Sequence, residues 1–290
     1  MFRPALVLSS AMILAAPLGA HELWIEPLEY VIERDTTIRA DLVNGQGFGG
    51  VVDGEQMGAS RIAFFPQRNA AFRYFLGSED APSAPVQGDL GQVPAVDVPP
   101  LADGLHVVAY VSTPATLNYE TWEKFQTFVD HKDLDNDLPD LGDTALAAHQ
   151  ARALPEADFE EVYIRHSKTL VAVGDGDGVD VATGMETEIV ALENPYTDDM
   201  TDGLRVGLLY QGQPRAAEQI ELFERSADGT VTITLVTTDD NGVAILPVRP
   251  GYFYMADAVV LREPSTERAE ATGAVWETLW ANLTFAVPAE

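Results

Sequence analysis

Short strands follow one another closely through roughly the last hundred residues, and this pattern constrains the fold more than any other feature of the chain. Short apolar or alternating runs lie at 187–192, 204–210, 219–225, 231–237, 243–248, 252–261 and 278–287. Turn signals separate them, among them Asp228-Gly229, Asn241-Gly242 and Pro250-Gly251. Strands at this spacing are typical of a β-sandwich. We therefore predict an antiparallel β-sandwich over residues 185–290.

The first half of the chain shows the same two-residue period. Residues 36–43 alternate apolar and polar side chains, as a half-buried strand does. In 105–113, Leu105, Val107 and Ala109 share one face, and His106 lies on the other. These runs predict a first sandwich over residues 21–118.

Between the two β regions the hydrophobic period changes. Trp122, Phe125, Phe128 and Val129 recur at helical spacing, and 144–154 is rich in alanine. We therefore expect a mostly β protein with two antiparallel β-sandwich domains, immunoglobulin-like or transthyretin-like. The expected boundaries are 21–118 and 185–290, joined by a helical connection and linking strand at 119–184.

The first twenty residues have the pattern of a secretory signal. Arg3 precedes an apolar run over 5–16, and the segment ends with the small residue Ala20. The run is too short to span a bilayer as a helix. We expect cleavage after Ala20, export to the periplasm and a mature chain that begins with His21.

Composition narrows the classes of function. The chain has no cysteine, which excludes disulfides and thiolate metal sites. Its 46 acidic residues against 17 Lys and Arg give a net charge of −29, so nucleic acid and anionic lipid are poor partners. No second apolar stretch is long enough to span a membrane, and we expect no membrane insertion of the mature chain.

A mature chain that starts at His21 offers two neighbouring nitrogens, the α-amine and imidazole Nδ1. Together they can close a chelate ring on one metal ion, and a second histidine would complete the T-shaped set called a histidine brace. Nitrogen ligands of this kind suit copper, nickel, cobalt and zinc.

The chain has five histidines, so the ligand sets are few. We expect His106, at the start of a strand, to be the second ligand. His166 is a candidate third ligand, and Asp103, three residues before His106, a candidate axial carboxylate. The other two histidines, at 131 and 149, are expected at the surface.

Eight stretches follow one another in a characteristic order: 21–27 (HELWIEP), 104–110 (GLHVVAY), 112–114 (STP), 124–125 (KF), 161–171 (EVYIRHSKTLV), 188–196 (EIVALENPY), 204–214 (LRVGLLYQGQP) and 276–285 (WETLWANLTF). In these stretches the chain resembles the DUF4198-domain proteins, exported bacterial proteins that include periplasmic components of cobalt- and nickel-type uptake systems. The stretches extend over nearly all of the mature chain. The resemblance implies a histidine start and delivery of metal to a membrane transporter. It gives no ligand role to His131 or His166, where the family commonly has other residues.

These features support one leading function and two alternatives. The leading hypothesis is a periplasmic, non-enzymatic protein that captures copper, nickel or cobalt through His21 and His106 and passes it to an uptake system. One alternative is a histidine-brace copper oxygenase acting on polysaccharide. The other is an adhesive or glycan-binding module without metal.

Overall fold

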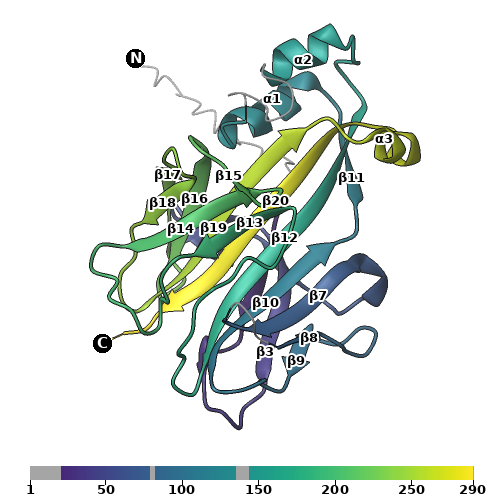
Figure 1. The fold of residues 1–290 in the computed structure, drawn as a ribbon. Helices are drawn as coiled ribbons and strands as arrows, with labels where there is room; N and C mark the ends of the chain where they lie inside the picture. The colour runs from purple at the N-terminus through teal and green to yellow at the C-terminus, as the bar shows by residue number, and fades with distance from the viewer. Residues whose placement is uncertain (1–20, 79–81, 135–143, 290) are drawn as a thin grey trace, which may run out of the picture.

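A computed structural model describes residues 21–78, 82–134 and 144–289 of the chain. It contains sheets packed face to face, and the predicted mostly β, sandwich-type class is confirmed (Figure 1). The predicted signal segment lies outside the described residues. In the described part of the chain, no helix has the length and apolar character needed to cross a membrane.

A ten-stranded sheet forms the middle of the molecule. Its main path runs β17-β16-β19-β20-β12-β10-β7-β8, and β2 and β11 pair with β12. The strands are β2 (Val31–Ile32), β7 (Asn69–Leu76), β8 (Ser83–Pro85), β10 (Gly104–Ser112), β11 (Ala115–Tyr119), β12 (Phe159–Val173), β16 (Gln219–Arg225), β17 (Val231–Thr237), β19 (Tyr252–Arg262) and β20 (Ala274–Val287). The long strands β12 and β20 lie parallel, and β10 and β19 flank them antiparallel.

A smaller sheet covers each face of the large one. The first contains β1 (Glu22–Pro27), β3 (Ile38–Gly45), β6 (Ala59–Ile62) and β9 (Val96–Val98). It packs on β7, β10 and β12 through a core that includes Ile25, Leu42 and Val108. The second contains β13 (Thr187–Ala191), β14 (Leu204–Tyr210), β15 (Gln213–Pro214) and β18 (Val243–Leu246). Its core with the opposite face includes Val206 and Leu283.

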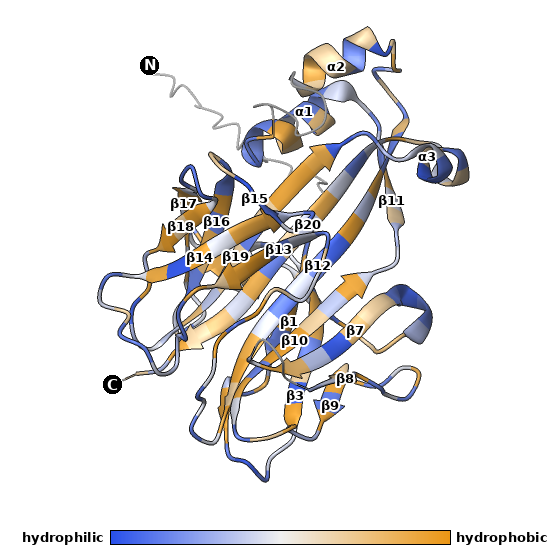
Figure 2. Cartoon of the chain, in the orientation of Figure 1, coloured by the Kyte–Doolittle hydropathy of each residue, from blue (hydrophilic) through white to orange (hydrophobic). Residues whose placement is uncertain are grey.

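The large sheet joins the two regions that the sequence divides. Strands β7, β8 and β10 come from the predicted first domain, and β16, β17, β19 and β20 from the second. Strand β12, predicted as part of the connection, lies between them and is buried along nearly its whole length. The two predicted sandwiches therefore share one sheet. In Figure 2 the central strands β12 and β20 show orange, pale and blue segments, so polar side chains also lie in strands that are buried along nearly their whole length.

Two helices close the upper end of the sheet in Figure 1. Helix α1 (Trp122–His131) begins after Thr121, whose hydroxyl accepts a hydrogen bond from the Lys124 N–H. Helix α2 (Ala145–Ala151) is capped in the same way by Thr144. The remaining short elements are α3 (Thr266–Thr272), η1 (Gly47–Gly49), η2 (Pro66–Arg68) and the hairpin β4 (Val51–Val52) and β5 (Glu55–Gln56).

Aromatic stacking fixes α1 on the sheet. The Phe125 ring stacks on Trp276 and the Phe128 ring on Trp280, both at 5.7 Å between centroids. This contact face follows the predicted helical spacing. It leaves the last turn of α1, with His131 and the following Lys132, over strands β16 and β19.

Candidate functional site

Strand β1, the first strand that the structure describes, lies across the large sheet. Strand β1 is held there by side chains of the central strands: the Ser167 hydroxyl donates to Leu23 O at 2.7 Å, and the Thr284 hydroxyl donates to Ile25 O at 2.6 Å. Strand β1 therefore runs in the same direction as β12 and β20. His21 directly precedes β1 and is exposed.

Next to the exposed His21 is a buried cluster of three carboxylates. Glu22 of β1, Glu221 of β16 and Asp257 of β19 each place a carboxylate oxygen within 4.8 Å of the other two. The Lys132 ammonium lies 3.0 Å from Asp257 Oδ2 and 3.3 Å from Glu22 Oε1, and it also donates to Glu221. With these four groups ionised, one ammonium faces three carboxylates, so they carry an excess of negative charge, which the nearby Arg165 guanidinium offsets in part.

The charged groups of this cluster shift one another's pKa values. Burial lowers the pKa of Lys132, but Asp257, Glu22 and Glu221 raise it more, so the ammonium form is favoured. Burial raises the pKa of Asp257, and the neighbouring carboxylates add to this, although Lys132 opposes it. The pKa of Glu221 is lowered, because its bonds to His131 and Lys132 outweigh burial.

His131 joins the cluster from the end of α1. Its Nε2 lies 3.1 Å from Glu221 Oε1, and this bond raises the pKa of the imidazole. The side chain is 65% exposed, and no described residue bonds its Nδ1. The sequence predicted its exposure correctly but not its contact with the carboxylate cluster. The sequence predicts the helix, but it does not indicate which strand the last turn of that helix contacts.

The structure does not bring His106 to His21, which corrects the predicted ligand pair. His106 lies opposite Val171 of β12, whereas Leu23 is fixed at Ser167. His21 is two residues farther in the same direction, so about six strand residues, or roughly 20 Å, separate the two histidines. The two histidines also differ in exposure: His21 is exposed, whereas His106 is fully buried.

His106 has a structural role instead. Its Nε2 accepts a hydrogen bond from the Leu101 N–H at 3.0 Å, so Nδ1 carries the proton and donates to Gly104 O at 3.1 Å. Burial lowers the pKa of the ring. A neutral histidine with both nitrogens bonded to backbone holds the loop before β10 and has no free lone pair for a metal.

The two other predicted ligands also lie elsewhere. His166 follows Arg165 and precedes Ser167 on β12, so its side chain points to the face opposite β1. It is buried, its Nδ1 lies 3.2 Å from Trp280 O, and burial lowers its pKa to about 4. Asp103 forms an ion pair with Arg34 at 2.8 Å.

The expectation that His149 faces solvent is wrong. Its ring is buried under α2, where Nδ1 accepts a hydrogen bond from Trp276 Nε1 at 3.1 Å. The other ring nitrogen then donates to Pro155 O at 3.0 Å. This histidine belongs to the aromatic core below the helices.

Fold and site together define a three-layered β protein with a buried carboxylate–lysine cluster at its N-terminal strand. The chain belongs to the DUF4198 family, described as a domain of unknown function, whose model matches residues 18–262. The predicted family is thereby confirmed, and its description assigns no activity. Comparison with curated proteins finds no match.

Proposed function

We propose that this protein is an exported, non-enzymatic carrier of copper, nickel or cobalt, which binds the metal at its mature N-terminus and delivers it to a membrane uptake system. The observation that carries the proposal is the position of His131. It contacts Glu221 in the same cluster that Glu22 enters, and Glu22 is the residue next to His21. A second histidine is thus close to His21, although it is not the one expected from the sequence.

The ligands in this proposal are nitrogens of two residues. The α-amine and Nδ1 of His21 form the chelate, and His131 contributes Nδ1. Metal-binding histidines usually donate their other ring N–H to a carboxylate, which fixes the ring and increases its basicity. Glu221 stands in that relation to His131 Nε2.

In this proposal the three buried carboxylates act through their charge and are not direct ligands of the metal. Lys132 lies among Glu22, Glu221 and Asp257, so an ion cannot take its place without displacing the ammonium. Their excess negative charge still favours a cation at the surface above them. The whole chain, with its net charge of −29, adds to this attraction.

The experiment is metal titration of mature protein whose first residue has been verified by intact mass. We expect one Cu(II) or Ni(II) per chain, measured by calorimetry and elemental analysis. Adding one glycine before His21 removes the amine chelate while it keeps both rings. That extension and His131→Ala should each weaken binding at least tenfold.

His106→Ala is the matched control, because it removes a histidine distant from the site, and its metal affinity should equal that of the parent. If the glycine extension binds metal as tightly as the parent does, the N-terminal site is refuted. A metal-free binding module would then be the better hypothesis. Oxidation of polysaccharide by the copper-loaded protein would instead favour the oxygenase.

A further inference from the structure

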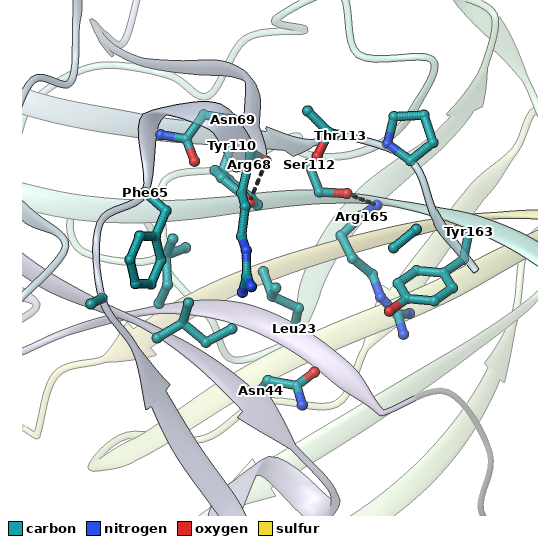
Figure 3. A pocket seen from close by; sticks show the side chains of 15 residues that line it. Leu23, Asn44, Phe65, Arg68, Asn69, Tyr110, Ser112, Thr113, Tyr163 and Arg165 are labelled. Carbon is teal, nitrogen blue, oxygen red and sulfur yellow. Dashed lines mark hydrogen bonds between the residues drawn. The ribbon is translucent and has the colours of Figure 1, made fainter. Parts of the chain in front are cut away.

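A pocket of about 460 Å³ lies between the first small sheet and the large sheet (Figure 3). Leu23 of β1 and Phe65 contribute apolar surface, and Asn44 and Ser112 contribute polar groups. Two arginines, Arg68 and Arg165, also line it, and their side chains extend toward β1. Among the described residues around this pocket there is no aspartate or glutamate.

Arg165 is the most constrained of these groups. It is only 3% exposed, and its guanidinium lies 3.9 Å from the Trp280 ring centroid and 4.8 Å from that of Tyr163. Stacking uses the planar faces, whereas hydrogen bonds form at the edge, where a guanidinium has five N–H donors. Its Nη1 is buried and has no hydrogen-bond partner in the described structure. An unsatisfied buried charged donor is costly, and no described residue supplies an acceptor to Nη1 of this arginine, which lines the pocket.

The arginines of this pocket differ from most other arginines of the chain, which form ion pairs with carboxylates. In the part of the chain that the structure describes, only three arginines, Arg68, Arg73 and Arg165, have no carboxylate within 4.0 Å. Two of the three line this pocket. Acidic residues outnumber basic ones 46 to 17, so most arginines have a carboxylate partner, and the two that line this pocket are among the few that do not.

Arg165 could alternatively serve only as a counter-charge for the buried carboxylates. Asp257, Glu22 and Glu161 do act on it electrostatically, but burial outweighs them and lowers its pKa. None of them forms an ion pair with it. Long-range attraction leaves the hydrogen-bonding capacity of Nη1 unused.

We propose that this pocket binds a small organic carboxylate, with the carboxylate on Arg165 and Arg68 and the apolar body against Leu23 and Phe65. Arginine presents paired N–H groups that match the two oxygens of a carboxylate. The amide of Asn44 and the hydroxyl of Ser112 offer further polar contacts along the wall. This inference uses neither His21 nor His131, so it can hold or fail independently of the metal proposal.

The test is calorimetric titration of the mature, chelator-treated protein with benzoate, benzamide and citrate. Benzamide has nearly the shape of benzoate without its charge. We expect saturable binding of benzoate or citrate, and benzamide binding at least tenfold weaker than that of benzoate. Because the protein is strongly acidic, non-specific binding of anions is disfavoured, and saturation reports a defined site.

Three variants locate the binding. Arg68→Gln and Arg165→Lys should each weaken carboxylate binding at least tenfold, whereas Arg73→Gln, which removes an arginine outside the pocket, should leave it unchanged. If Arg165→Lys fails to fold, the affinities of Arg68→Gln and Arg73→Gln are compared instead. Arg68 is exposed, so its replacement should not prevent folding. The proposal is overturned if neither benzoate nor citrate saturates, if benzamide binds as well as benzoate, or if Arg73→Gln loses as much affinity as Arg68→Gln.

Discussion

The Lys132 ammonium lies 3.0 Å from the Asp257 carboxylate, although 125 positions separate the two residues in the chain. One partner follows helix α1 and the other belongs to β19. The same ammonium also contacts Glu22 of β1 and Glu221 of β16. One lysine therefore ties the helix, the N-terminal strand and the large sheet together next to the proposed metal site.

Replacement of Lys132 should be among the most damaging substitutions. Lys132→Met leaves three carboxylates buried without their ammonium, and breaking a buried ion pair in this way costs about 3 to 5 kcal/mol. Urea unfolding at pH 7 measures the loss. The variant should regain stability as pH falls, because its carboxylates take up protons in the folded state. Lys124→Met, which removes an exposed lysine paired with Glu120, is the control and should change the unfolding midpoint little. Equal effects of the two substitutions would contradict the role of the cluster.

Glu161 should destabilise the protein as pH rises. Burial raises its pKa to about 6, although the Thr278 hydroxyl and Arg165 oppose this shift. The folded state then holds the proton more tightly than the unfolded state, whose pKa is 4.5, so stability is lost as pH rises across that interval. The loss is about 2 kcal/mol. The unfolding free energy of Glu161→Gln minus that of the parent should increase by this amount between pH 4 and pH 7.5. A pH-independent difference would show that Glu161 titrates normally.

His106 and His131 should behave in opposite ways when replaced. His106→Ala leaves the Leu101 N–H without its acceptor and opens a cavity, at a cost of about 2 to 4 kcal/mol in unfolding free energy. Its affinity for Ni(II) should not change. His131→Ala should lose Ni(II) affinity and keep most of its stability, because the side chain is largely exposed. Thermal unfolding and calorimetry on both variants test this, and loss of metal binding in His106→Ala would restore the ligand expected from the sequence.

The sequence was sufficient to predict most of the longer strands and the fold class, because these depend on local periodicity. It did not predict that β12 joins both halves, since the parallel pairing of β12 with β20 is made by residues far apart in the chain. His106 shows the same limit at a single site. A buried histidine that bonds backbone and one that binds a metal have the same sequence context, and only the Leu101 N–H distinguishes them.

The last prediction concerns the protonation of His131. Its bond to Glu221 raises the pKa of the imidazole above the ordinary value of 6.5. Metal must displace that proton, so apparent affinity should keep increasing as pH rises beyond the usual imidazole range. Glu221→Gln removes the negative charge and should lower the pKa of His131, as measured by NMR titration of the ring in metal-free protein. Glu26→Gln is the matched control, because Glu26 lies on the same strand as Glu22 but pairs with Arg225. His131 titrating identically in both variants would mean that Glu221 does not control its proton, and the proposed site would lose its orienting carboxylate.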